Sequence, residues 1–375
     1  MERGLWMSRK WYFAALLVAV AALGVVGAST ASNGSAKLDK VTLQLKWVTQ
    51  AQFAGYYAAA AQGYYKDAGL DVKIKVGGPN ITPEQVVAGG QAQFGLDWLP
   101  SLLATRDAGT QLVNIAQVFT RSGMTELTWK DSGITSIKAM AKKKVGVWCC
   151  GNQFELYAAL TKNGINPNSS SAVTIVNQPF DMNLFLSRQV DAAAAMTYNE
   201  LAQVLETKNP KTGKLYTLAD LNVIKLQNAG TGMLEDGIFS TAGWLKDPKH
   251  VDIAKRFVAA SLKGWAYCRD NASACVNTVL QNGPTLGKGH QTWQMNEINA
   301  LIWPAPKGVG VMDPAAYETT AKIAQQFKVI KKAPTAGAYR TDIAKAAVAS
   351  LKKDGVDVFG KSWHKASIKV TPGGK

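Results

Sequence analysis

The chain has 375 residues, of which 47% are hydrophobic and 18% are charged, and its formal net charge is +16. This composition is ordinary for a globular protein. The basic residues do not form stripes with interleaved aromatic residues, which argues against a nucleic-acid-binding protein.

Residues 1–36 are predicted to be a secretory signal peptide. Three basic residues precede an apolar run at 11–28, and small residues follow through Ala36. An uncleaved membrane anchor is the alternative, because a run of 18 residues is at the lower limit for a membrane span. The many alanines and the small residues after the run favour cleavage. We therefore expect an exported, soluble, periplasmic protein.

From residue 41 strands alternate with helices, which predicts an α/β fold with two parallel or mixed sheets that are covered on both faces. The first predicted series has strands at 41–45, 70–76, 92–96 and 112–118, and helices at 53–68, 83–89 and 100–108. The second has strands at 144–148, 173–176, 190–196 and 222–226, and helices at 154–163, 182–187 and 199–206. After Gly230 the pattern is almost wholly helical, with helices at 251–280, 291–301 and 314–327.

Two lobes are expected, because about 340 residues exceed what a single core usually holds. Residues 41–128 and 231–330 are assigned to lobe 1, and residues 129–230 to lobe 2. Two crossings, near 125–130 and 226–233, would leave a cleft between the lobes, and such clefts are favoured small-molecule sites.

Residues 331–375 are assigned to a basic C-terminal extension, with ten Lys or Arg and three Asp. We expect a solvated helix face followed by a disordered end. The alternative is contact with an anionic membrane surface or an acidic partner.

Four cysteines are present in this exported chain. Cys268 and Cys275 fall in one predicted helix, where seven residues correspond to about 10.5 Å of rise. A disulfide needs Cα atoms within about 7 Å, so the two can pair only if the helix breaks near Asp270. For the adjacent Cys149 and Cys150, a tight turn of small residues is preferred to a vicinal disulfide. The three histidines lack metal-ligand spacing, so no metal site is expected.

The most informative stretch is 45–57, where an apolar strand ends and two amides and four aromatic rings follow. Ligands bind at the carboxyl ends of strands in open α/β sheets. Rings and amides suit a flat, nitrogen-bearing ligand. The ligand-binding candidates are Trp47, Gln50, Phe53 and Tyr56. Alternatively, the rings at 53, 56 and 57 form the buried face of a helix.

The turn after the strand at 144–148 supplies four more candidates, Trp148, Cys149, Gly151 and Asn152. A glycine allows close approach of the backbone, and free amide hydrogens at a helix N-terminus favour acceptor or anionic groups. No Lys-Ser or Lys-Thr follows the glycine, so the turn is not a phosphate loop. The alternative is that Asn152 only caps the helix.

Residues at two other strand ends and at the close of the return crossing complete the predicted site. The remaining candidates are Asp97, Trp98, Tyr198, Glu200, Glu235 and Asp236. Carboxylates beside one cleft would bind amino or protonated ring nitrogens through charge-assisted hydrogen bonds. Glu200 is alternatively a helix cap or a hinge salt bridge, Trp129 either forms a wall or packs in the hinge, and Asn199 is expected to cap its helix.

Several motifs resemble the substrate-binding proteins of ABC importers, and more narrowly the group related to thiamin pyrimidine synthase. The matching segments are 45–47, 52–57, 63–72, 89–95, 145–148, 178–181, 191–200 and 234–239. The resemblance implies a type II periplasmic binding protein fold whose two lobes close around a ligand. It also implies delivery to an ABC permease by a monomer. Thiamin pyrimidine precursors rank first as ligands, riboflavin follows, and sulfonates and taurine are less favoured.

The synthases in this group are enzymes, so the resemblance also tests for catalysis. They hold pyridoxal phosphate on a lysine and consume a histidine, both just after the strand equivalent to 94–96. Asp97 and Ser101 stand at those positions, and neither an aspartate nor a serine can supply that chemistry. The cysteine-rich motif expected near 230–239 is absent as well. We therefore expect a binding protein that is not an enzyme and holds no cofactor.

Overall fold

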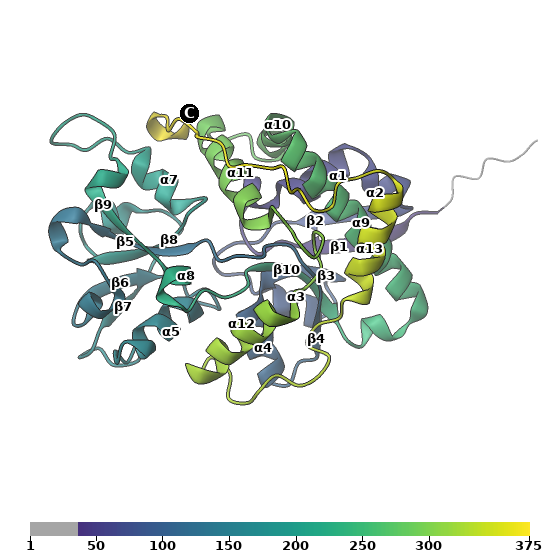
Figure 1. The fold of residues 1–375 in the computed structure, drawn as a ribbon, viewed down its shortest axis with the longest axis horizontal. Coiled ribbons are helices and arrows are strands. Elements are labelled where there is room, and N and C mark those ends of the chain that lie inside the picture. The colour runs from purple at the N-terminus through teal and green to yellow at the C-terminus, as the bar shows by residue number, and fades with distance from the viewer. Residues whose placement is uncertain (1–36) are drawn as a thin grey trace, which may run out of the picture. The chain divides into compact units, whose positions relative to one another are not determined.

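The computed structural model describes residues 37–375, and the predicted signal peptide lies outside them. Two five-stranded sheets organise the described residues (Figure 1). Sheet A has the strand order β2-β1-β3-β10-β4, and sheet B has the order β7-β6-β8-β5-β9. Parallel and antiparallel pairs occur in both, which confirms the predicted α/β fold with mixed sheets. Within this part of the chain, no helix combines the length and the apolar character needed to cross a membrane.

Sheet A with its helices is called lobe 1 below. Its strands are β1 (Asp39–Gln44), β2 (Leu70–Lys75), β3 (Phe94–Trp98), β4 (Leu112–Gln117) and β10 (Asp236–Thr241). The helices between its first four strands are α1 (Ala54–Ala61), α2 (Tyr64–Asp67), α3 (Pro83–Ala88) and α4 (Leu99–Asp107). β1 and β3 pair in parallel, so their carboxyl ends lie at the same edge of the sheet. This pairing brings the residues after Gln44 close to Trp98.

Sheet B with its helices is called lobe 2. Its strands are β5 (Met124–Trp129), β6 (Lys144–Val147), β7 (Thr174–Asn177), β8 (Ala192–Met196) and β9 (Leu221–Lys225). Its helices are α5 (Phe154–Lys162), α6 (Asn183–Leu186), α7 (Glu200–Leu205) and α8 (Leu226–Ala229). The parallel pairing of β6 with β8 places the turn at Trp148 beside the loop that precedes Glu200.

Two interior strands differ from the sequence prediction. Residues 124–129, assigned to lobe 1 and the first crossing, form β5 between β8 and β9 of sheet B, so the chain leaves sheet A before residue 124. β10 lies between β3 and β4, in a region that was predicted to be almost wholly helical. Polar side chains obscured the apolar pattern of β5. Thr125 Oγ1 donates to Ala195 O at 2.8 Å and Thr128 Oγ1 donates to Ile134 O at 2.6 Å, whereas the buried carboxyl oxygens of Glu126 lack a partner among the described residues. Trp129 stacks on Phe185 within lobe 2 and forms no cleft wall.

The remaining helices follow β10. They are α9 (Pro248–Asp270), α10 (Ala272–Asn282), α11 (Lys288–Ile302), α12 (Pro314–Gln326) and α13 (Asp342–Lys353). α9 crosses α1 at two facing glycines, where a Cβ on Gly264 would lie 2.0 Å from Gly55 O. Beside this crossing, the buried Trp265 packs edge-on against Tyr56 with ring centroids 5.7 Å apart.

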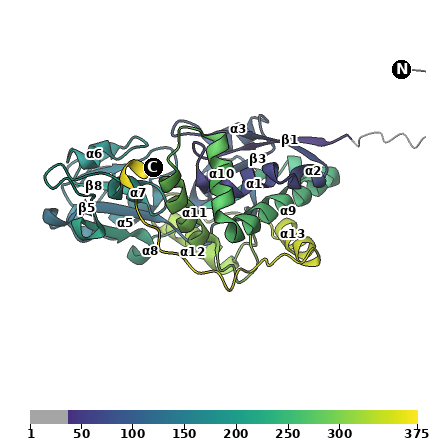
Figure 2. The same ribbon diagram turned by 90° about the horizontal axis from the view of Figure 1, so that it is seen from above.

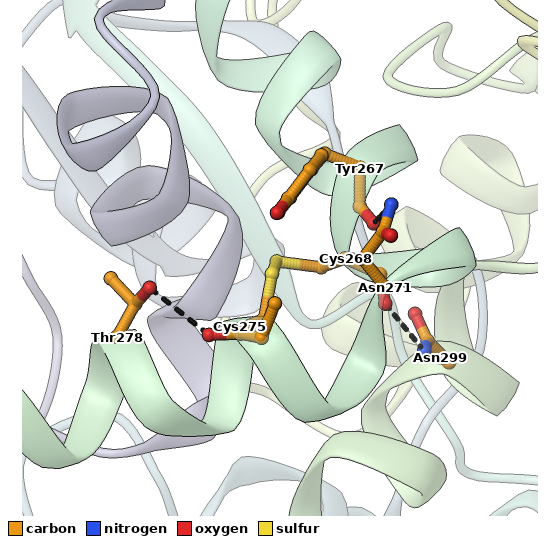
Figure 3. The surroundings of a disulfide bond; sticks show 7 residues. Tyr267, Cys268, Asn271, Cys275, Thr278 and Asn299 are labelled. Atoms are coloured by element: carbon orange, nitrogen blue, oxygen red, sulfur yellow. Dashed lines mark hydrogen bonds between the residues drawn. A yellow bond between two sulfur atoms is a disulfide. The ribbon is translucent and has the colours of Figure 1, made fainter.

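The predicted helix at 251–280 is broken at Asn271, between α9 and α10. The break brings the Cα atoms of Cys268 and Cys275 within 5.5 Å, and their sulfur atoms form a disulfide (Figure 3). The sequence predicted that this disulfide could form only if the helix broke near Asp270, and the structure has that break. Cys149 and Cys150 are also disulfide-bonded, contrary to the expectation of unpaired small residues. The turn accommodates this pair with Cys150 in the left-handed region, at a φ of 65°.

Replacing both Cys268 and Cys275 with alanine is expected to lower stability by about 2–3 kcal/mol, the loop-closure entropy of a short loop. Thermal unfolding measured without reductant tests this expectation. The control is the wild type with dithiothreitol, which should approach the melting temperature of the variant. Equal melting temperatures for wild type and variant without reductant would contradict the pairing.

The basic C-terminal segment is packed on the rest of the protein instead of forming a solvated extension. Tyr339 forms a parallel bridge with Asn114 of β4, and α13 packs against α9. A stripe of buried apolar residues interrupts the lysines of α13: Ile343, Ala344, Ala347 and Leu351. Figure 2 shows the yellow segment running from α13 to its end beside α7. There the backbone N–H of Gly373 donates to Glu206 O at 2.9 Å.

Candidate functional site

A cavity lies where the carboxyl ends of strands from both sheets face each other. Lobe 1 contributes Lys46, Trp47, Gln50, Gln52 and Trp98, and lobe 2 contributes Trp148, Asn152, Met196, Tyr198, Asn199 and Glu200. The rings of Trp47 and Trp148 meet across it edge to face, with centroids 6.3 Å apart. The loops that begin at Trp47 and at Cys149 therefore lie on the same side of the molecule and face each other.

The cavity has a volume of only about 20 Å³. Sites for drug-sized ligands are usually about 300–1,000 Å³. Two contacts between the lobes keep it narrow: the Trp47–Trp148 pair, and a hydrogen bond of 3.2 Å from Ser101 Oγ to Gly151 O. A ring-sized ligand can enter only if these contacts open.

Asp236 organises the lobe 1 side of the cavity from beneath. Its carboxylate accepts hydrogen bonds of 2.9 Å from Gln52 Nε2 and from Trp98 Nε1. Gln50 Nε2 donates in turn to Gln52 Oε1 at 2.6 Å. Burial raises the pKa of Asp236 to about 6, and the bond from Gln52 and the charge of Lys46 oppose that rise. Asp236 therefore sets the orientation of an amide and an indole that do line the cavity.

Lys46 forms a buried ion pair with Asp97, so its positive charge is neutralised. Its Nζ also lies 4.8 Å from the centroid of the Trp98 ring. Glu84 lies beside this pair, and burial together with the charge of Asp97 raises its pKa well above the usual range. Among the described residues that line the cavity, Lys46 alone carries a cationic side chain. A free cation for an anionic ligand is thus missing from the lining.

Glu200 supplies a carboxylate on the lobe 2 side. One oxygen accepts from the backbone N–H of Met196 at 2.9 Å, and the other accepts from Asn199 Nδ2 at 2.6 Å. Burial raises the pKa of Glu200 to about 7, opposed by these hydrogen bonds and by the charge of His290. Glu200 is therefore partly protonated near neutral pH.

Seven of the predicted site residues line the cavity: Trp47, Gln50, Trp98, Trp148, Asn152, Tyr198 and Glu200. That they contact a ligand stays a prediction. Seven others do not line it: Phe53, Tyr56, Asp97, Cys149, Gly151, Glu235 and Asp236.

The seven that fall outside have structural roles. Phe53 and Tyr56 belong to the core of lobe 1, as the alternative interpretation of that helix predicted. Glu235 is fully buried and accepts from the backbone N–H of Gly123 at 2.6 Å, which ties the two crossings together. Asp97 and Asp236 act on the cavity only through Lys46, Gln52 and Trp98. The turn at 149–151 contributes its backbone, which receives the bond from Ser101.

Sequence reasoning missed Lys46, Gln52, Met196 and Asn199 as lining residues. Gln52 was visible as the second amide of the 45–57 stretch, and Lys46 immediately precedes Trp47. Asn199 was assigned to a helix cap, yet its side chain makes no capping hydrogen bond. Its amide instead connects Glu200 with His290.

The family model described as "NMT1/THI5 like" matches residues 50–274. The riboflavin-binding protein RibY of Chloroflexus aurantiacus is 24% identical over 305 residues, covering 78% of this chain and 82% of that protein. The formylaminopyrimidine-binding protein of Halalkalibacterium halodurans is 31% identical over 103 residues, covering 28% of this chain and 31% of that protein. Among solved structures, the alkanesulfonate-binding protein SsuA of Xanthomonas axonopodis pv. citri aligns with a TM-score of 0.58 at 15% identity, covering 82% of this chain and 99% of that one. The chain belongs to the NMT1/THI5-like family.

Proposed function

We propose that this protein is the periplasmic solute-binding component of an ABC importer, and that it captures a small planar nitrogen heterocycle. A pyrimidine precursor of thiamin is the first candidate. The observation that carries the proposal is the cavity between the two sheets, where Trp47, Trp98 and Trp148 meet amide and carboxylate side chains. Indole faces stack on flat rings, and side-chain oxygens accept hydrogen bonds from amino groups.

Capture requires the lobes to separate and close again. The Trp47–Trp148 and Ser101–Gly151 contacts close the site, and both join lobe 1 to lobe 2. A ligand held by both walls favours the closed arrangement in proportion to its extra contacts there. The protein would act as a monomer and deliver the ligand to the permease, with the lysine-rich C-terminal segment available to an anionic membrane surface.

Charge favours an amino-bearing ligand over an anion. Lys46 is already paired with Asp97, whereas Glu200 presents a carboxylate on the opposite wall. A sulfonate bound here would face that carboxylate without a free cation. By this argument the ligand of this chain differs in class from that of the alkanesulfonate-binding SsuA protein, although the two share a fold.

Riboflavin is the second candidate. The RibY relative covers most of this chain, whereas the formylaminopyrimidine-binding relative matches less than a third of it. Three indoles could enclose a tricyclic ring once the lobes open. The narrow cavity favours the smaller pyrimidine.

Catalysis is not part of the proposal. Asp97 stands where the synthases carry their lysine, and it is engaged with Lys46. Ser101 stands where they carry their histidine, and its hydroxyl donates to Gly151 O. Neither side chain supplies the chemistry of the residue that it replaces.

Replacing Trp47 with alanine is expected to weaken ligand binding by at least about 30-fold, because truncating a central aromatic anchor commonly costs about 2 kcal/mol or more. Titration calorimetry with formylaminopyrimidine, riboflavin and taurine measures this effect and identifies the ligand class. Val48→Ala is the matched control, because this neighbouring side chain is 38% exposed and does not line the cavity. Unchanged affinity in Trp47→Ala would show that the ligand binds elsewhere. Tight binding of taurine alone would contradict the proposed ligand class.

A further inference from the structure

His290 lies behind the lobe 2 wall of the cavity, in the first turn of α11. Its Nδ1 is 3.0 Å from both carboxylate oxygens of Glu206, and its Nε2 is 2.8 Å from Asn199 Oδ1. The side chain is 14% exposed and does not line the cavity. His290 therefore reaches the candidate site only through Asn199.

The hydrogen bonds determine which way the Asn199 amide points. Its Nδ2 donates to the Glu200 carboxylate at 2.6 Å, so its Oδ1 must face His290 and accept from Nε2–H. If this amide turned over, its oxygen would face the carboxylate oxygen of Glu200. Asn199 is 5% exposed, and a buried carbonyl that loses its donor costs about 1–3 kcal/mol. The His290 ring thus selects the amide orientation that supports Glu200.

The C-terminal segment holds His290 from the other side. Gly374 has a φ of 67°, and a Cβ there would lie 2.7 Å from His290 Cβ and 2.8 Å from Glu206 Oε2. The backbone N–H of Gly373 donates to the backbone oxygen of Glu206 at 2.9 Å. Residues 373–374 therefore close directly over the His290–Glu206 pair, and only glycine fits at position 374 without displacing it.

The same helix also contacts lobe 1 beside the cavity. The side-chain oxygens of Gln291 and Gln294 both accept from the backbone N–H of Ala51, at 2.7 and 2.8 Å. On the lobe 2 side, Trp293 Nε1 donates to Thr197 O at 3.0 Å. α11 is thus hydrogen-bonded to the loops of both lobes that carry lining residues. A residue in its first turn can therefore influence the positions of those lining side chains.

We propose that His290 is a positioning residue of the ligand site, which orients Asn199 and thereby the Glu200 carboxylate, and that residues 373–374 lock it in place. This inference rests on the proposed function, because it assigns the site a ligand that Glu200 recognises. The ligand group that Glu200 would bind is an amino group or a ring N–H, which donates a hydrogen bond to the carboxylate.

The charge of the ring gives His290 an effect that a merely structural residue would lack. In its protonated form the ring lowers the pKa of Glu200 against the effect of burial. Glu206, directly after α7, also faces His290. Burial and the charges of nearby carboxyl groups, Glu200 among them, raise the pKa of Tyr198. Removing the ring charge should therefore move the protonation of Glu200 to higher pH.

Two substitutions separate the hydrogen bond from the charge. His290→Ala removes both, and His290→Gln keeps an N–H donor for Asn199 but removes the charge. With formylaminopyrimidine or riboflavin as the probe, His290→Ala should bind at least tenfold more weakly at pH 7.5. His290→Gln should recover part of that loss, with the midpoint of its pH–affinity profile shifted upward. His364→Ala is the control, because this histidine is exposed.

A readout without ligand keeps the test independent of the proposed function. The side-chain amide signals of Asn199, assigned by their loss in Asn199→Ala, are followed by NMR in the ligand-free protein. Shifts of these signals in His290→Ala and in Gly374→Ala, with none in His364→Ala, would support the positioning role. Unmoved Asn199 signals in His290→Ala, or an unmoved pH midpoint in His290→Gln, would overturn it. If neither probe binds the wild type, the proposed function fails, and the NMR result alone decides the inference.

Discussion

Replacing Gly264 with valine is expected to destabilise the protein by at least about 3 kcal/mol, the upper part of the range for overpacking a well-packed core. A Cβ at this position would lie 2.0 Å from the backbone oxygen of Gly55 and 3.0 Å from Ala59 Cβ. The obstruction is backbone, so it cannot be relieved by a rotamer change. α1 and α9 would have to separate, which would expose the buried ring of Trp265. Because α1 directly follows the loop of Trp47 and Gln50, the cavity should be distorted as well.

Thermal unfolding followed by circular dichroism measures the loss. Gly243→Ala is the matched control: its φ of −63° suits any residue, and a Cβ there would meet nothing within 4 Å. We expect the control to unfold like the wild type and Gly264→Val to unfold at least about 4 °C lower or to be recovered only as aggregate. Wild-type stability in Gly264→Val would mean that α1 and α9 do not cross at these glycines.

A second large effect is expected from Glu155→Gln, because Glu155 is one of two buried carboxyl groups where the lobes join. Ser122 Oγ donates to Glu155 Oε2 at 2.7 Å, and the backbone N–H of Gly123 donates to Glu235 Oε1 at 2.6 Å. The second oxygen of each carboxyl lacks a partner among the described residues. Burial raises the pKa of Glu155 to about 8, and burial together with the charge of Glu155 raises that of Glu235.

The sign of the pH dependence follows from these shifts. A buried acid with a raised pKa keeps its proton in the folded state at pH values where the unfolded chain has released it. The free energy of unfolding therefore falls as the pH rises from about 4.5, the unfolded value, to about 8, the folded value. Glu200 and Asp236, with pKa values of about 7 and about 6, act in the same direction over narrower windows.

Glu155→Gln removes one of these ionisations while keeping the shape of the side chain. We expect the variant to gain stability relative to the wild type as the pH rises from 6 to 9, by on the order of 2–4 kcal/mol at the upper end. Melting temperatures across this range measure the gain. Glu318→Gln, at an exposed position, is the control and should follow the wild type throughout. Parallel curves for Glu155→Gln and the wild type would show that Glu155 is already ionised in the folded protein.

The α/β class, the location of the candidate cavity and the family followed from the sequence for local reasons. An apolar strand followed by Trp47 and Gln50 places those side chains at a strand end, and parallel pairing brings the ends of neighbouring strands together. The same rule applied to Trp98, Trp148, Tyr198 and Glu200, all of which line the cavity. The cysteine spacing also predicted that a Cys268–Cys275 disulfide required a helix break, which the structure places at Asn271.

Residues whose roles depend on distant partners could not be assigned in this way. The polar side chains of β5 hide an interior strand, because the partner of its buried Thr125 is a backbone oxygen of β8, which lies some 70 residues later in the chain. Asp236 looked like a ligand-binding carboxylate, but β10 inserts beside β3 and turns it toward Gln52 and Trp98. The basic C-terminal segment looked solvated because charge dominates its composition, whereas its packing depends on a four-residue apolar stripe and on the face of α9.

The sequence by itself determined which segments are strands and helices over most of the chain, and which strand ends carry rings and amides. Only the tertiary structure decided which polar side chains face the cavity and which hold others in place. The physical reason is that periodicity records how one segment divides its residues between inside and outside. A hydrogen bond such as that from His290 to Asn199 joins segments 91 residues apart, and no local pattern encodes it.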